Sequence, residues 1–284
     1  MIAQIWAQIP DLKPVHLDDT IRGWNHRLQA GFNINQSTFS DNWKGGGTNS
    51  VALGAVFTDK INYASDKSEY VSDIQLGYGS VQNKGQSIRK TTDRIFIDQK
   101  YGYKVHHDFY VFGSLNFQSQ FDAGFKYELS KDGIESSSLI SKFFAPAYFT
   151  QSIGLEYKRG QWLSTRAGFG TLRQTFVLDT TLYRNVPSNY GVKAGKKTRF
   201  EVAMLLVVDV DRNIMKNLNL KTRYSLFYNY ETPKTADSRL DLILTAKVNK
   251  YVNVNLSGTV LYDKDMDTSV QYTQALSLGL MYTR

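Results

Sequence analysis

The sequence of 284 residues contains no cysteine, only five prolines and no long hydrophobic run. The absence of cysteine suits a chain that crosses an oxidising periplasm unfolded. The longest apolar stretch, Val202 to Val208, has the length of a strand, whereas a transmembrane helix needs about 18 apolar residues. Proline is rare while tyrosine (18) and phenylalanine (16) are abundant, which favours strands. These absences exclude a helical membrane span and point to a β-rich chain.

Signatures of catalysis are also scarce. The chain has four histidines, and a serine hydrolase needs one of them as a base beside the nucleophile. No Gly-x-Ser-x-Gly elbow occurs. His26, next to Asn25, is the one candidate base, although a polar residue at a membrane interface is the simpler interpretation. His16 precedes the first predicted strand, and His106-His107 falls at a short predicted turn. We therefore expect no catalytic residue.

No motif for a metal or a cofactor stands out either. Asp263, Asp265 and Asp267 occupy alternate positions, but the glycine and distal glutamate of a calcium loop are missing. Turn chemistry explains these aspartates more simply. The Gly45–Gly47 run is not followed by the Lys-Ser/Thr start of a phosphate-binding helix. The sequence predicts neither a metal site nor a bound cofactor.

The formal net charge of +8 raises the question of an anionic partner. The basic residues are scattered along polar faces and loops, without a dense tract or an aromatic stacking motif, so we expect no nucleic-acid partner. Anionic outer-membrane lipid is the more natural partner for this charge, and a solvated surface is simpler still.

What the chain does have is an alternation with a period of two. Within 28–34, 218–230 and 252–262, apolar and polar residues take turns. Successive side chains of a strand point to opposite faces, so each segment has one apolar and one polar face. No other part of the sequence resembles a layer that could cover the apolar faces. A closed sheet with its apolar face in lipid needs no such layer. The sequence predicts an all-β fold, a closed antiparallel transmembrane β-barrel of the outer-membrane type.

About twelve segments have the length that spans a membrane when tilted. Two strands could be gained or lost in the irregular stretch 149–173. The predicted strands run near 22–34, 48–61, 68–79, 91–104, 107–121, 149–158, 162–173, 197–210, 216–230, 237–249, 251–263 and 269–283.

The predicted connections alternate between long and short, which is how bacterial barrels separate extracellular loops from periplasmic turns. The longest are 35–47, 80–90, 122–148 and 174–196. An even number of strands places both termini in the periplasm. A soluble β-sandwich has no reason for this asymmetry, so we expect the bacterial cell outer membrane.

The pattern continues without a linker, which indicates one barrel domain over 22–284. Residues 1–21 precede it as a separate segment. The start is too short for a secretion signal, but Ile5-Trp6-Ala7 resembles the end of one. The segment is a remnant of a signal followed by either a periplasmic tail or a plug of the lumen.

The polar faces predict the residues that line the lumen. Both signs of charge occur on one face, so these charges can pair across strands and narrow the interior. Tyr110, Phe112 and Phe227 also face inward. The predicted lumen-lining residues are Arg94, Asp98, Lys100, Arg199, Glu201, Lys221, Arg223, Arg239, Asp241 and Lys247.

Two features belong to the predicted extracellular side. In segment 133–148, apolar residues fall at helical spacing, so it forms either a short helix at the mouth or an ordered loop on the rim. A set of basic residues lies in or beside the long loops, as candidate contacts for the phosphates of lipopolysaccharide or as solvated charges: Lys44, Lys84, Arg89, Lys90, Lys193, Lys196 and Lys197.

Several local runs resemble a family of Bacteroidota outer-membrane proteins that is catalogued only as a domain of unknown function. The runs are Trp43 to Asn49, Arg89 to Asp93, Phe117 to Phe121, Ser141 to Tyr148, Ser152 to Tyr157 and Leu261 to Asp265. The resemblance covers about residues 22–284. It implies a barrel in a Gram-negative Bacteroidota envelope, with no assigned reaction and no known site. One departure is the final residue, Arg284, where barrel proteins carry an aromatic residue.

We derive two functional hypotheses of different classes. The first is a non-catalytic structural or accessory subunit of a larger envelope assembly, in secretion, barrel insertion or surface-lipoprotein handling, with other envelope proteins as partners. The second is a passive small-solute channel with a mild anion preference. A lipid-modifying enzyme ranks third.

Overall fold

The computed structural model describes residues 22–40, 42, 44, 48–129, 135–160, 162–183, 188–233, 236–247, 252–265 and 268–280. The predicted N-terminal segment 1–21 lies outside these residues, as do Gly45–Gly47 and Asp267. The described part of the chain is almost entirely β-structure, with one 3-10 helix, η1 (Thr180–Tyr183). None of its helices has the length and apolar character needed to cross a membrane.

Twelve antiparallel strands form one sheet whose order follows the chain. Each of the twelve predicted segments overlaps one of these strands. The bounds are β1 (Gly23–Ser37), β2 (Ser50–Ala64), β3 (Ser68–Asn83), β4 (Arg89–His106), β5 (Phe109–Ser119), β8 (Ala147–Arg159), β9 (Leu163–Phe176), β12 (Thr198–Met215), β13 (Leu218–Asn229), β14 (Asp237–Lys247), β15 (Val252–Tyr262) and β16 (Gln271–Leu280).

Four further strands form two hairpins outside this sheet, which makes sixteen strands over the described residues. One hairpin pairs β6 (Gly124–Leu129) with β7 (Glu135–Ser141), and the other pairs β10 (Ser188–Asn189) with β11 (Val192–Lys193). Both hairpins belong to the two longest links between strands of the main sheet, β5 to β8 and β9 to β12.

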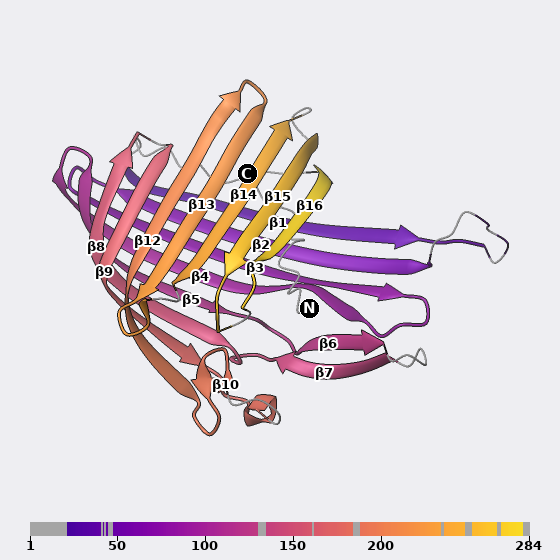
Figure 1. Cartoon of the computed structure of the whole chain (residues 1–284). Helices are drawn as coiled ribbons and strands as arrows, with labels where there is room; N and C mark the ends of the chain where they lie inside the picture. The colour runs from indigo at the N-terminus through magenta and orange to yellow at the C-terminus, as the bar shows by residue number, and fades with distance from the viewer. Residues whose placement is uncertain are drawn as a thin grey trace.

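The main sheet curls so that its last strands, β12–β16, lie over its first strands, β1–β5 (Figure 1). The predicted closed ring is not what the described residues form, because β1 and β16 end the sheet and no pairing joins them. The alternating sequence pattern determines the two faces of each strand but says nothing about which edges meet. The alternating pattern therefore does not predict whether the first and last strands pair to close the barrel.

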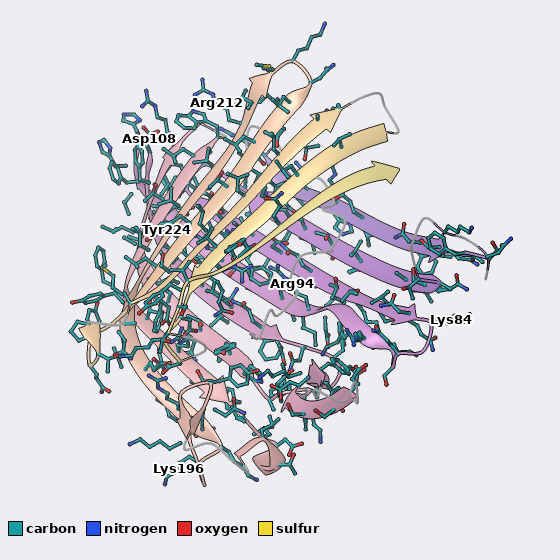
Figure 2. All side chains as sticks on the ribbon, turned by 45° about the vertical axis from the view of Figure 1, so that its right-hand side comes forward. Lys84, Arg94, Asp108, Lys196, Arg212 and Tyr224 are labelled. Carbon is teal, nitrogen blue, oxygen red and sulfur yellow. The ribbon has the colours of Figure 1, made fainter. Side chains whose placement is uncertain are left out.

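The links divide the sheet into two rims. Short turns join the strands at one rim, for example 65–67, 107–108 and 216–217. Longer links run at the other, and in Figure 2 Lys84 and Lys196 mark this loop rim while Asp108 and Arg212 mark the turn rim. One predicted long link is wrong in length. The connection of β3 to β4 covers only 84–88, because the two strands keep pairing beyond an irregularity at Gly79.

The two faces of the sheet have opposite polarity. Charged and polar side chains such as Lys100, Glu156 and Glu201 are buried on its concave side. Large apolar side chains are exposed on the other side, an inversion of the arrangement in a water-soluble protein. They include Trp24, Leu28, Phe32, Tyr101, Val111, Leu115, Ile153, Leu155, Phe200, Val202 and Val260.

The only cluster of buried apolar residues in the described chain lies in the loops. Ala145, Val177, Leu182 and Val192 pack together, with Leu139 and Tyr190 against them. These residues come from the links β5 to β8 and β9 to β12. We call the packed segments 135–146, 177–183 and 188–193 the loop cap.

The helix considered for segment 133–148 is wrong. Residues 135–141 form β7, because the backbone of the serine run pairs with β6 instead of with itself. After β7 the chain is ordered on the rim, where the Phe144 ring packs against Phe117 and Phe176 with ring centroids 5.4 and 6.5 Å apart. The second sequence alternative, an ordered loop with aromatic residues on the rim, matches this arrangement.

Candidate functional site

The concave interior holds a network of ion pairs, and its first cluster lies toward the turn rim. Lys100 Nζ is 2.5 Å from Glu156 Oε2 and 2.9 Å from Glu69 Oε1. Lys158 pairs with the same Glu69, and the Ser164 hydroxyl donates to Glu156 at 2.7 Å. These residues stand on β3, β4, β8 and β9, and β3 does not neighbour β8 in the sheet. The pairs therefore tie together strands that backbone hydrogen bonds do not join.

A second cluster occupies the middle of the interior. The Arg166 guanidinium lies between two carboxylates, 3.5 Å from Asp98 and 3.4 Å from Asp209. Arg223 Nε donates to Asp209 at 2.6 Å. Asp98 stands on β4 and Arg166 on β9, with β5 and β8 between them in the sheet. This cluster also crosses the concave side instead of following it.

A third cluster lies toward the loop rim. Arg173 on β9 contacts Glu201 at 3.0 Å and Asp237 at 2.8 Å, and Asp237 begins β14. Arg199 contacts Glu201 at 3.0 Å and also pairs with Asp265, between β15 and β16. The tip of the β10–β11 hairpin rests on this pair.

Glycine is required at that tip. Gly191 has a φ of +74°, and a Cβ there would lie 1.8 Å from Arg199 Nη1. The hairpin can therefore approach the Arg199–Asp265 pair only where a side chain is missing. This contact joins the loop cap to the ionic interior.

Between the middle cluster and the loop cap lies a cavity of about 270 Å³. Its charged lining consists of five arginines and four aspartates: Arg94, Arg166, Arg173, Arg223, Arg239, Asp98, Asp237, Asp241 and Asp263. Apolar and aromatic side chains complete the walls, among them Phe96, Leu205, Phe227, Leu261, Tyr148 and Tyr190. In Figure 2, Arg94 lies within the curl of the sheet.

The residues predicted to line the lumen fall into three groups. Arg94, Asp98, Arg223, Arg239 and Asp241 line the cavity. Lys100, Arg199 and Glu201 belong to the ion-pair clusters on either side of it, and Lys221 acts electrostatically on Asp209. Lys247 is exposed where β14 ends at the turn rim, so the structure does not bring it to the others.

Sequence reasoning missed several residues that the interior depends on, notably Glu69, Glu156, Arg166, Arg173 and Asp237. Three of them lie in 149–173, where the ladder shifts register between Ile153 and Gly154 and the alternation is interrupted. One signal was available, because Glu156 and Lys158 alternate with Leu155 and Tyr157 at the end of a predicted strand.

The basic residues of the loops also divide. Arg89 pairs with Glu135 at 2.9 Å, and Lys90 pairs with Asp93 at 2.6 Å. Lys44, Lys84, Lys193, Lys196 and Lys197 are exposed. Arg89 and Lys90 are therefore paired within the protein itself.

His26, the one candidate base, is held by a carboxylate. Its Nε2 lies 2.5 Å from Asp59 Oδ1, and its side chain is exposed on the same face of β1 as Trp24 and Leu28. Within the described residues, no hydroxyl group contacts His26, and no cluster of histidine and acidic residues could hold a metal ion.

Two aspartates outside the strands have shifted acidities. The Lys142 ammonium and the hydroxyl and N–H of Thr181 lower the pKa of Asp179 to about 2. Burial raises the pKa of Asp263 above its ordinary value, and the neighbouring Asp265 carboxylate acts in the same direction. Asp263 therefore holds its proton more strongly than an ordinary aspartate, which weakens the negative charge on the cavity wall.

The fold and the site together define an all-β protein built on one curled antiparallel meander, apolar outside and ionic inside. Residues 34–125 match the family described as a protein of unknown function (DUF3078), and residues 154–283 match a second one, a protein of unknown function (DUF481). The prediction that the matching families are catalogued only as domains of unknown function is confirmed. No curated protein matches the chain.

Three solved structures are similar at low sequence identity. The translocator domain of the autotransporter NalP from Neisseria meningitidis is 12% identical, over 94% of this chain and 90% of that chain, with a TM-score of 0.44. The NanC porin is 9% identical over 89% and 98%, with a TM-score of 0.40. The CymD monoaromatic hydrocarbon channel is 10% identical over 94% and 89%, with a TM-score of 0.38.

Proposed function

We propose that this protein is a closed outer-membrane β-barrel without catalytic activity and that it serves as a structural or accessory subunit of a larger envelope assembly. The inverted polarity of the sheet supports the membrane location. Its strands have 10 to 18 residues, enough for the roughly 9–11 that a tilted membrane strand needs. A bilayer leaves no water for the edges of β1 and β16, so these edges meet when the barrel is inserted.

The braced interior is the observation that carries the accessory role. Ion pairs join β3 to β8, β4 to β9 and β9 to β14, across the concave side. A solute passing through would have to break these pairs, and a buried pair that loses one partner costs about 3–5 kcal/mol. A rigid barrel of this kind suits a scaffold in secretion, barrel insertion or surface-lipoprotein handling.

The two rims of the sheet suggest how the barrel is oriented in the outer membrane. With twelve strands in the main sheet, β1 begins and β16 ends at the turn rim. We place this rim in the periplasm and the loop rim outside, where the exposed lysines Lys44, Lys84, Lys193, Lys196 and Lys197 contact lipopolysaccharide phosphates. The resemblance of the local sequence runs supports a Bacteroidota envelope.

A passive small-solute channel with a mild anion preference is the second candidate function. The five arginines that line the cavity favour it. A lipid-modifying enzyme is the third candidate. The His26–Asp59 pair favours it, but such an enzyme also needs a nucleophile beside His26.

The decisive experiment is purification of the tagged full chain from native outer membranes in mild detergent, with mass spectrometry of the proteins that accompany it. A stoichiometric partner supports the accessory role, and a barrel that purifies alone contradicts it.

Planar-bilayer recording then tests the channel. Steady conductance whose ion selectivity shifts in Arg239→Gln supports a channel, and silence over a range of voltages removes it.

A further inference from the structure

Arg94 differs from the four other arginines of the cavity. Arg166, Arg173, Arg223 and Arg239 each lie within 3.5 Å of at least one carboxylate. Among the described residues, no carboxylate lies within ion-pair distance of Arg94. Its guanidinium stacks over the Phe96 ring at 4.8 Å.

The surroundings of Arg94 make this lack of a partner costly. Arg239 and Arg223 repel it, while Asp241 and Asp73 attract it from farther away than an ion pair. Asp241 already accepts two hydrogen bonds from Arg239, both 2.7 Å long. A cation in a protein interior needs a partner to offset the loss of hydration. The position is therefore arranged for a negative charge that the described chain does not supply.

The other arginines of the lining are matched by carboxylates of the protein. Arg166 and Arg223 pair with Asp209, Arg173 pairs with Glu201 and Asp237, and Arg239 pairs with Asp241. The single unpaired guanidinium among the described residues therefore matches one ligand with one negative charge.

The size and the walls of the cavity restrict the ligand further. Its volume of about 270 Å³ lies just below the ~300–1,000 Å³ range of small-molecule pockets. Phe96, Phe227, Leu205 and Leu261 present apolar surface beside the charged groups. A bare inorganic anion leaves these walls without contact, and a long acyl chain exceeds the space. A carboxylate on a compact aromatic or apolar body satisfies both parts of the wall.

We propose that this cavity is a binding site for one small organic monoanion, a carboxylate on a compact apolar or aromatic body, whose charged group is bound by Arg94. The site goes beyond the accessory role and does not depend on it, because binding in the cavity requires neither a protein partner nor conduction.

Calorimetric titration of the purified full chain in detergent tests the site, with benzoate as the probe. Benzamide has nearly the same shape without the charge, and inorganic phosphate has charge without the apolar body. We expect benzoate to bind with a stoichiometry of one, and benzamide and phosphate to bind at least about tenfold more weakly, since benzamide lacks the charge that pairs with Arg94 and phosphate lacks the apolar body that contacts the walls. Equal binding of benzamide or of phosphate overturns the proposal, as does the absence of benzoate binding.

Three variants assign the binding to Arg94. Arg94→Gln should weaken benzoate binding at least about tenfold, whereas Arg212→Gln, the same change at an exposed arginine over Trp162 on the turn rim, should leave it unchanged. Asp241→Asn removes one negative charge from the cavity wall and should tighten benzoate binding, which a purely structural effect does not produce. If Arg94→Gln binds as wild type, or if Asp241→Asn does not bind more tightly, the assignment is wrong. Should Arg94→Gln fail to fold, Asp241→Asn still tests whether benzoate binds in this cavity.

Discussion

The strands and the loop cap bury opposite kinds of residue. Inside the curl of the sheet, the fully buried side chains include Glu156 and Gln29, and ion pairs join strands that are not neighbours. In the loop cap, the buried side chains are Ala145, Val177 and Val192, each with no exposed surface. Buried apolar residues of the described strands, such as Phe96, Phe112 and Phe227, are scattered among polar ones, and the described chain gathers buried apolar residues into a cluster only above the rim.

This contrast separates two ways of fixing a structure. Apolar contacts in the loop cap are stabilising and non-directional, so they hold two loops together without demanding one geometry. Buried ion pairs add little net stability, but each charge accepts few arrangements. In the interior, the pairs join strands that face each other across the curl, and we infer that they restrict which strands can do so. The predictions below test this division, beginning with the largest effect.

Removing one charge from the interior should be the most damaging change. Lys100→Met leaves Glu156, with only 1% of its surface exposed, without its cation. We expect a loss of about 3–5 kcal/mol in the free energy of unfolding, measured by urea denaturation followed by tryptophan fluorescence. The double variant Lys100→Met/Glu156→Gln is the control and should recover most of this loss. A double variant no more stable than the single one would contradict the role given to the pair.

An apolar truncation in the loop cap should act locally. Leu182→Ala removes a buried side chain from the cluster and should destabilise the cap by about 2–4 kcal/mol. Trypsin should then cleave faster after Lys142 and Lys193, while the urea midpoint of the strands stays at the wild-type value. Leu242→Ala, a truncation on the outer face of β14, serves as the control. A shift of the urea midpoint by Leu182→Ala would show that cap and strands unfold as one unit.

The acidity of Asp179 gives the loop cap a defined pH response. Its pKa of about 2 lies below the ordinary value of 3.8, so its contact with Lys142 stabilises the cap above about pH 4. This contribution is lost as the pH falls from about 4 toward 2. Hydrogen exchange at residues 139–145, corrected for its intrinsic pH dependence, should accelerate over that range. Asp179→Asn should exchange faster at neutral pH and lose most of this pH response, and an unchanged response would contradict the assignment.

The sequence predicts the strands well because period two is a local property. Each of the twelve strands of the main sheet was anticipated within a few residues, including β8 and β9 in the irregular stretch. The predicted strand ends are wrong where two strands continue to pair beyond the end of the alternating sequence pattern. The link 84–88 is shorter than the predicted 80–90, since β3 and β4 continue to pair past an irregularity.

The ion-pair partners of the interior charges could not be predicted from the sequence for a different reason. Lys100 meets Glu156 across β5, and Arg173 meets Asp237 across β12 and β13, so each contact depends on the curl of the whole sheet. Register shifts add to the difficulty. A Cβ at Gly154 would lie 1.9 Å from the carbonyl oxygen of Ala167. The alternation of apolar and polar residues does not predict this close approach. The loop cap was missed because its residues meet only after two long links have folded.

Arg94 should give the smallest effect on stability, and for that reason the most informative one. Since no described carboxylate pairs with it, Arg94→Gln leaves no buried anion behind and should lower the free energy of unfolding by less than about 1 kcal/mol. Arg173→Gln, which strips Glu201 and Asp237 of their cation, should cost several times more in the same urea assay. An arginine that the barrel does not need for stability, in a cavity where the other arginines are paired, is best explained by a ligand. If Arg94→Gln lowers the free energy of unfolding as much as Arg173→Gln does, Arg94 belongs to the structural ion-pair network. The distinction between ligand site and structural ion pairs is then wrong for Arg94.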